Sequence, residues 1–327
     1  MESPIIIIGA PRSGTSLLSR IIGSHPAIAV PYESHFYATF MPWFAYYGDL
    51  HKRRNRERLV RDVLQTAMFR DWEPRVDRQA ALARIEANGR FDPDGIFAGI
   101  MEAWSEDQGK RRWGEKTPVH VFVADRIAMK FPDAQFIHIV RDGRDVALSW
   151  MRARFGPKDI YHAATRWLDF LAAARKLEAT LDPTRFFELR YEALLRDPEA
   201  QARRICAFLG EDYAPDMLDF HRFEGRYPTD VRNQENLVRP LIGDNSGKWR
   251  QQLTSREIRI FEGVAGVALE RNGYEPVARH ARVSAFERFQ AKSTHPVNRI
   301  ISMARNTKGH MDGLIRVMIY LRLRAGL

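Results

Sequence analysis

The most constraining feature of the sequence is a short apolar strand that runs directly into a glycine-containing loop. Four consecutive isoleucines, Ile5–Ile8, are followed by the segment Gly9–Ser16, and the pattern predicts a helix from about Thr15 to Gly23. A β-branched apolar run of this length is typical of a strand that is buried on both faces of a parallel sheet. The order strand, loop, helix therefore predicts the start of an α/β fold.

The loop has the composition of a phosphate-binding turn. Gly9 and Gly14 are separated by four residues, and two hydroxyl residues follow. Backbone N–H groups that turn inward, together with the N-terminus of the following helix, stabilise a bound anion. The residues expected to hold it are Pro11, Arg12, Ser13, Gly14, Thr15 and Ser16.

This loop departs from the pattern of nucleoside triphosphatases. Those proteins place a lysine after the second glycine, where it reaches the β- and γ-phosphates. The present chain has Thr15 at that position and carries its cation, Arg12, inside the loop. We therefore expect a ligand with a single phosphate at this point. A P-loop kinase or triphosphatase is the alternative enzyme, and a nucleotide-binding protein without turnover is the alternative outside enzymes.

A second strand and helix repeat the arrangement. Residues 134–140 predict a strand, Arg141 stands at its end, and Ser149 follows eight residues later, one to two turns into the next helix. Ligands of open α/β sheets bind at the carboxyl ends of the strands. Arg141 and Ser149 are therefore candidates for holding a second anion, although an arginine at this position also suits an ion pair with Asp142 or Asp145.

Taken together, the segments Gly9–Ser16 and Ile139–Ser149 resemble the two signature segments of sulfotransferases that use 3'-phosphoadenosine 5'-phosphosulfate (PAPS). In that family the first segment holds the 5'-phosphosulfate and the second, here with Arg141 and Ser149, holds the 3'-phosphate. The resemblance extends over most of residues 4–275 and is closest to the branch of tyrosylprotein sulfotransferases and their bacterial relatives. It implies an O-sulfotransferase that takes PAPS as donor, releases adenosine 3',5'-bisphosphate (PAP) and needs no metal.

The resemblance also implies a catalytic base. In the family this base follows shortly after a His-Pro pair, and the matching position is Glu33, which follows His25 and Pro26. Glu33 would take the proton of the acceptor hydroxyl. On the residues alone, Glu33 equally suits the cap of a helix that begins near Ser34, and His35 is an alternative base.

Two cations complete the implied transfer site. Gly114–Pro118 is similar to the family's Lys-x-Pro element, whose lysine lies at the sulfuryl group, although Lys116 taken alone also suits a solvated turn. Arg12 is implied to bridge the 5'-phosphate and the sulfuryl oxygens, which its planar fork suits. The nucleotide contacts implied further along are Tyr191, in the segment Leu189–Leu194, and Ser246 and Lys248, in the segment Asn245–Trp249.

The acceptor is expected to be a hydroxyl-bearing molecule, and the sequence leaves a glycan, a lipid, a small molecule and a tyrosine as alternatives. Residues 32–47 contain many aromatic side chains directly around the proposed base. These rings are candidates for lining an acceptor pocket. Packing of an amphipathic helix into the core is the more common use of such a pattern.

The positive charge of the chain is concentrated at its C-terminal end. The formal net charge is +10, and from His280 onward nine basic and two acidic residues contribute +7 of it. The segment from Gly313 to Arg324 mixes apolar residues with arginines. It is expected to dock on the body or on another subunit of a homodimer, with peripheral membrane contact through residues 311–327 as the alternative. Without a recognition motif for bases, we expect no nucleic-acid partner.

The expected architecture is a P-loop-type three-layer α/β fold, with a central parallel sheet flanked by helices. We expect a sulfotransferase domain over residues 1–279, with a helical insertion around 35–110, and a basic, partly helical extension over 280–327. Cys206 is the only cysteine, which favours a reducing compartment and a buried thiol. Since no run of about 18 apolar residues occurs, we expect a cytoplasmic protein, with the inner face of the membrane as an alternative site.

Overall fold

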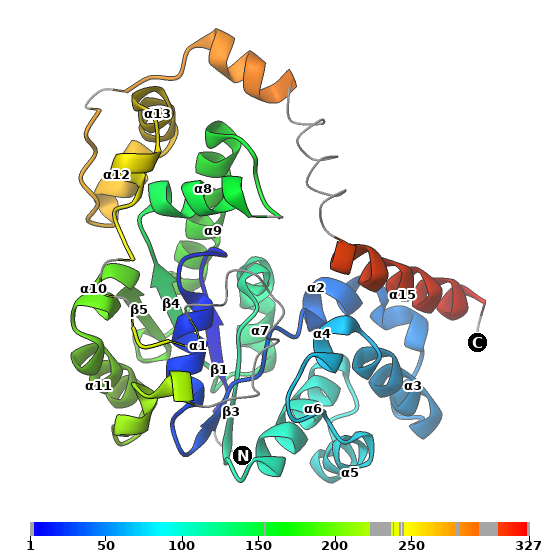
Figure 1. The fold of residues 1–327 in the computed structure, drawn as a ribbon. Helices are drawn as coiled ribbons and strands as arrows, with labels where there is room; N and C mark the ends of the chain where they lie inside the picture. Colours follow the sequence, from blue (N-terminus) through cyan, green and yellow to red (C-terminus); the bar gives the residue numbers. More distant parts are fainter. Residues whose placement is uncertain are drawn as a thin grey trace.

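A parallel sheet with helices on both faces lies at the centre of the computed structural model (Figure 1). The structure describes residues 3–153, 155–222, 237, 239–241, 243, 245–278, 281–293 and 307–325. The sheet has the strand order β2-β3-β1-β4-β5, and every pairing in it is parallel. Its strands are β1 (Ile5–Ile8), β2 (Ile28–Ala29), β3 (Arg112–Glu115), β4 (Gln135–Val140) and β5 (Phe186–Arg190). The predicted fold class is confirmed.

β1 is the central strand, with two strands on either side of it. On one edge it pairs with β3, where Ile6 lies opposite Glu115, and on the other it pairs with β4. Its side chains alternate between the faces, as the period of a strand requires: Ile6 and Ile8 belong to one hydrophobic cluster, Ile5 and Ile7 to another. Burying each isoleucine contributes roughly 1.5–3 kcal/mol relative to leaving it exposed.

Helices pack against both faces of this sheet. One cluster, which contains the buried thiol that the sequence predicts, includes α1 (Thr15–Gly23), α10 (Tyr191–Arg196) and α11 (Pro198–Leu209). The other cluster includes α7 (Ala124–Lys130), α8 (Gly143–Arg152), α9 (Ile160–Glu178) and α13 (Ser255–Arg271). Short connecting elements are η2 (Pro118–Val123), η3 (Pro183–Arg185), η4 (Pro215–Met217), η5 (Phe220–Arg222) and α12 (Trp249–Gln252), and residues 285–293 are also helical.

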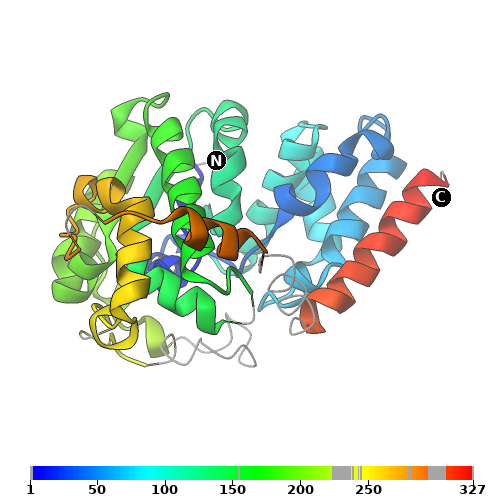
Figure 2. The same ribbon diagram turned by 90° about the horizontal axis from the view of Figure 1, so that it is seen from above.

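The segment between β2 and β3 is helical and forms a second group beside the sheet (Figures 1 and 2). It comprises α2 (Phe36–Phe40), η1 (Met41–Tyr47), α3 (Arg53–Leu64), α4 (Ala67–Arg70), α5 (Arg78–Asn88) and α6 (Pro93–Asp107). Many of its aromatic rings are core residues. Phe36 is buried and stacks on Phe97 of α6, with ring centroids 4.6 Å apart. Packing, the more common use of such rings, therefore accounts for Phe36 and its buried neighbours Tyr37, Phe40 and Tyr47.

The C-terminal helix α15 (Thr307–Arg324) lies against this helical group (Figure 2). Ile319 and Leu323 are buried, and the Tyr320 ring is 6.0 Å from that of Trp43 in η1. Arg322 also forms an ion pair with Asp62 of α3. α15 thus docks on the body, one of the two docking modes that the sequence leaves open. The boundary at residue 279 stays a prediction.

We expect Arg322→Ala to lower the free energy of unfolding by about 1–3 kcal/mol, because it removes one partner of a buried carboxylate. The side chain of Asp62 is fully buried, and among the residues that the structure describes it would keep hydrogen bonds only from Tyr47 and Arg61 after the change. Urea denaturation measures this loss. Arg324→Ala, at an exposed position of the same helix, should change stability by less than about 0.5 kcal/mol. Equal stability of the two variants would contradict docking through Arg322.

Candidate active site

The loop between β1 and α1 adopts a conformation that its glycine makes accessible. Arg12 and Gly14 both have left-handed backbones, with φ of 74° and 95°. A Cβ atom on Gly14 would lie only 2.4 Å from Cδ2 of the Tyr191 ring. No other residue therefore fits at position 14 without a shift, and the loop packs directly on the tyrosine that the sequence assigns to the nucleotide.

Arg141 lies beside the same loop. Its guanidinium donates to the carbonyl of Arg12 at 3.1 Å and to the carbonyl of Asn245 at 2.8 Å, and it stacks 4.4 Å from the centre of the Tyr191 ring. Its Nε and the hydroxyl of Ser13 are buried and find no hydrogen-bond partner among the described residues. An unpaired buried donor costs about 1–3 kcal/mol. Two such donors beside one loop fit a bound anion.

The residues of the two predicted anion sites are in direct contact. Arg12 Nε donates to Ser149 Oγ at 2.9 Å, which joins the loop to α8. Burial, and then the neighbouring charge of Arg141, lower the pKa of Arg12. Arginine stays charged even so, and a polyanion would relieve this concentration of positive charge.

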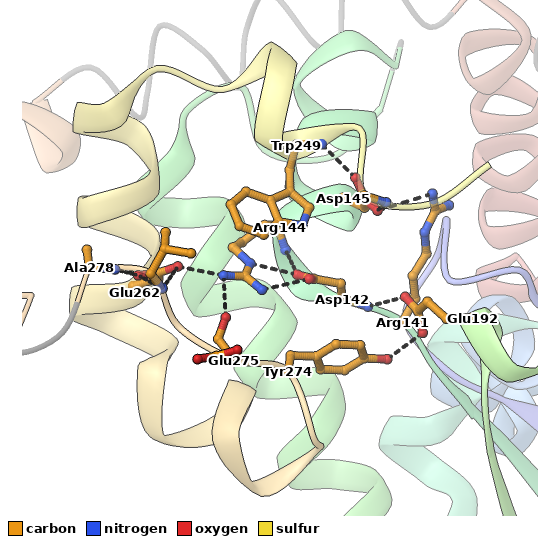
Figure 3. A network of polar contacts seen from close by, with 12 residues as sticks. Arg141, Asp142, Arg144, Asp145, Glu192, Trp249, Glu262, Tyr274, Glu275 and Ala278 are labelled. Carbon is orange, nitrogen blue, oxygen red and sulfur yellow. Dashed lines mark hydrogen bonds and ion pairs between the residues drawn. The ribbon is translucent and has the colours of Figure 1, made fainter. Parts of the chain in front are cut away.

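Asp145 anchors the segment Asn245–Trp249, here called the late loop, beside Arg141 (Figure 3). Its Oδ2 accepts from the backbone N–H of Gly247 at 2.6 Å, and its Oδ1 accepts from that of Trp249 at 2.9 Å. The same carboxylate lies 3.8 Å from the Arg141 guanidinium, one of the two ion pairs that the sequence leaves open. The loop that carries Ser246 and Lys248 is thereby held next to Arg141, the residue predicted for the second anion site.

Asn245 ties the late loop to the nucleotide tyrosine. Its amide donates to the hydroxyl of Tyr191 at 2.9 Å, and its side-chain oxygen accepts from Lys248 Nζ at 2.7 Å. The family resemblance assigns no nucleotide contact to this residue. Asn245 gives no signal in the sequence, because its contact with Tyr191 joins residues 54 positions apart.

A buried network of ion pairs lies beside Arg141 (Figure 3). Arg144 donates two hydrogen bonds to the carboxylate of Asp142, at 3.0 and 2.8 Å, and one to Glu262 of α13 at 2.6 Å. Its guanidinium stacks 3.6 Å from the centre of a Trp249 ring. Buried charges are tolerated only when they are fully paired. The network therefore links α8, α12 and α13. The sequence gives no local signal for it, because Trp249 and Glu262 are distant from Arg144 in the chain.

The proposed base and the lysine lie in direct contact. Lys116, which follows β3, donates to Glu33 Oε1 at 2.6 Å and to Ser16 Oγ of the phosphate loop at 3.1 Å. The lysine side chain is fully buried, whereas that of Glu33 is 20% exposed. His35 Nε2 lies 2.9 Å from the other oxygen, Oε2. The structure therefore joins Glu33, Lys116 and the phosphate loop.

The electrostatic surroundings keep Glu33 ionised. Burial raises the pKa of this carboxyl, but Lys116 and His35 outweigh burial and lower the pKa to about 2. Glu33 does not cap the following helix. That helix, α2, begins at Phe36, and its N-cap is His35, without a side-chain cap. His35, the alternative base, is a hydrogen-bond partner of Glu33, and the choice between the two residues stays a prediction.

Among the described residues, no group of three or more His, Cys, Asp and Glu side chains is placed to hold a metal ion. The metal-free chemistry stays a prediction. In the same parts of the chain, every helix is too short or too polar to cross a membrane.

Fold and site together define an α/β protein in which a glycine-containing loop after β1 contacts the basic side chain that follows β4. A profile described as the sulfotransferase family matches residues 4–215. Protein-tyrosine sulfotransferase A of Caenorhabditis elegans is 24% identical over 308 residues, which cover 91% of this chain and 74% of the relative. Omega-hydroxy-beta-dihydromenaquinone-9 sulfotransferase of Mycobacterium tuberculosis is 35% identical over 149 residues, 41% of this chain and 38% of the relative.

Two solved structures show the same fold. The sulfotransferase domain from the Synechococcus PCC 7002 olefin synthase superposes with a TM-score of 0.56 at 23% identity, over 80% of this chain and 94% of that domain. The sulfotransferase domain from the curacin biosynthetic pathway gives 0.57 at 18% identity, over 84% and 99%. The chain belongs to the sulfotransferase family, and it is a PAPS-dependent O-sulfotransferase, as its sequence predicts.

We expect Arg141→Lys to lower the affinity for PAP by about tenfold more than the affinity for adenosine 5'-phosphate, because a lysine loses the planar fork of donors. Calorimetry with the two nucleotides measures the difference. Arg203→Lys, in an exposed pair with Glu199, is the control and should leave both affinities unchanged. An equal loss of affinity for both nucleotides would contradict the assignment of Arg141 to the 3'-phosphate.

Proposed function

We propose that this enzyme transfers the sulfuryl group with Glu33 as the general base and with Arg12 and Lys116 as the cations at the moving group. The observation that carries the proposal is the 2.6 Å contact between Glu33 and Lys116, together with the bond from Lys116 to Ser16 in the phosphate loop. A base, a cation and a phosphate loop in contact are what an in-line transfer to an alcohol requires.

The step balances as a displacement at sulfur. The acceptor oxygen attacks the sulfur of PAPS and forms a new S–O bond, while the S–O bond to the 5'-phosphate breaks. The acceptor proton passes to Glu33, and the electron pair leaves with PAP. Lys116 donates to the bridging oxygen as negative charge grows on it, and Arg12 holds the 5'-phosphate and the sulfuryl oxygens. We expect this without a metal, because the fixed cations supply the charge.

Glu33 needs a change in its surroundings to act as a base. A carboxylate with a pKa of about 2 takes up a proton poorly. Since Lys116 lowers that pKa, any shift of the lysine toward the oxygens of bound PAPS weakens the ion pair and raises the pKa of Glu33. Donor binding would then strengthen the base at the moment when the acceptor proton must be removed.

The donor is proposed to lie across the joined anion sites. The 5'-side would be held by Pro11, Arg12, Ser13, Gly14, Thr15 and Ser16, and the 3'-phosphate and adenine by Arg141, Ser149, Tyr191, Ser246 and Lys248. The Ser13 hydroxyl and the Arg141 Nε support this placement, because both are buried and have no hydrogen-bond partner in the part of the chain that the structure describes. Tyr191 supports it as well, since its ring contacts both the loop and Arg141.

The acceptor carries a hydroxyl group, and its class is still a proposal. One relative is named for protein tyrosine and another for an omega-hydroxy menaquinone. A peptide tyrosine and a lipid alcohol are therefore the first acceptors to test, followed by glycans and small molecules. The cytoplasmic location and a homodimer also stay predictions.

Glu33→Gln should reduce the transfer of labelled sulfate by about 100-fold or more, because it removes the proton acceptor. Its affinity for PAP, measured by calorimetry, should be retained or slightly increased, since a negative charge near the anion site is lost. Glu57→Gln, on the helical segment away from Lys116, is the matched control. A Glu33→Gln enzyme with normal turnover would rule out the proposed base.

The membrane surface is the proposed further partner, contacted peripherally through residues 311–327. Exposed apolar side chains on one side of α15 support this. Leu314, Val317, Met318 and Leu321 recur with helical spacing and are all more than half exposed. We expect Leu314→Ser/Leu321→Ser to reduce flotation with anionic vesicles severalfold without undocking the helix. Equal flotation of variant and parent would contradict membrane contact, and a loss of dimer in the variant would assign this side to a second copy.

A further inference from the structure

A second carboxylate lies beneath the proposed base. Glu115 ends β3, directly before Lys116, and is 1% exposed. Its Oε1 accepts from the hydroxyls of Ser34 at 2.8 Å and Thr117 at 2.5 Å. Its Oε2 accepts from the backbone N–H of Thr117 at 3.2 Å and lies 3.1 Å from Nδ1 of His120. These contacts use the four acceptor positions of an ionised carboxylate.

The hydroxyl of Thr117 is used just as fully. It donates to Glu115 and accepts from two successive backbone N–H groups, those of Ser34 at 3.1 Å and His35 at 3.2 Å. A hydroxyl has one donor and two lone pairs, so a single threonine oxygen ties the turn at residues 34–35 to the end of β3.

The hydrogen bonds to the Thr117 hydroxyl hold a strained piece of backbone. His35 has a φ of 49°, in the left-handed region that residues other than glycine rarely adopt. Such a conformation is unfavourable and persists only where the surroundings enforce it. The bond from His35 N–H to Thr117 supplies part of that enforcement, and the bond from the His35 ring to Glu33 uses the resulting orientation.

The members of this cluster flank both halves of the proposed catalytic pair. Ser34 and His35 directly follow Glu33, and Glu115 and Thr117 stand on either side of Lys116. We propose that Glu115 and Thr117 are positioning residues that set the contact between Glu33 and Lys116. Their role in turnover rests on the proposed function of Glu33, whereas their role in placing the carboxylate does not.

The charge on Glu115 is maintained locally. Burial raises its pKa, but His120, whose side chain is also fully buried, outweighs this and lowers the pKa. An ionised Glu115 can accept from both hydroxyls and from the backbone. A protonated carboxyl would have to donate one bond and would give up an acceptor position.

The test compares two substitutions of one residue. Thr117→Val keeps the shape but loses the hydroxyl, and we expect its kcat to fall about 10- to 100-fold, as small misplacements of catalytic groups do. Its affinity for PAP, measured by calorimetry, should stay within about twofold of the parent, because no donor contact is assigned to Thr117. Thr117→Ser keeps the hydroxyl and should retain most of kcat. Equal rates for the two variants, or a parallel loss of PAP affinity, would overturn the proposal.

A second measurement separates placement from catalysis. The pKa of Glu33, followed by carbon NMR of the carboxyl, should rise from about 2 in Thr117→Val and not in Thr117→Ser, because Glu33 moves away from the charges of Lys116 and His35. This shift is expected even if Glu33→Gln remains active, so the two proposals fail independently. An unchanged pKa in Thr117→Val would refute the positioning role.

Glu115→Gln is the second variant, in case Thr117→Val fails to fold. It removes the charge and turns one acceptor into a donor at nearly the same volume. We expect the same fall in kcat with PAP affinity retained, together with a rise in the pKa of Glu33. Full activity and an unchanged pKa would overturn the proposal.

Discussion

The structure depends on the parallel pairing of β1 with β3 and β4. Parallel strands end at the same edge of a sheet, so the residues that follow these three strands meet there: the phosphate loop after β1, Lys116 after β3 and Arg141 after β4. Because β1 is central, its loop contacts both neighbours, through Ser16 to Lys116 and through the Arg12 carbonyl to Arg141.

The charges at this edge are arranged in two ways. Around Arg12 and Arg141 the positive charge is left partly unpaired, with a buried Nε that lacks a partner among the described residues. At Lys116 the charge is balanced by Glu33. The first arrangement favours a polyanion. The second keeps the Glu33 carboxylate ionised until Lys116 also contacts a ligand. Buried hydrogen-bond networks adjoin both arrangements, one around Arg144 and one around Glu115.

Local signals in the sequence predict much of this site. The isoleucine run and the glycines give β1 and its loop, and the predicted helix matches α1, Thr15–Gly23. β2 and β3 are missed, because one has two residues and the other reads Arg-Trp-Gly-Glu, which has no apolar alternation. Ser149, expected at the 3'-phosphate, also bonds the arginine of the other anion site. That contact joins residues 137 positions apart, and no local pattern reveals it.

The sequence by itself determined the strand, the phosphate loop, the family and the residue types that bind anions, because each depends on the order of nearby residues. Only the tertiary structure decided which charges are paired and which are free. Glu33 meets Lys116 across 83 positions and Glu115 meets Ser34 across 81, through the order of strands in the sheet. The pKa of a carboxyl follows from burial and from the charges beside it, and both are properties of the folded chain.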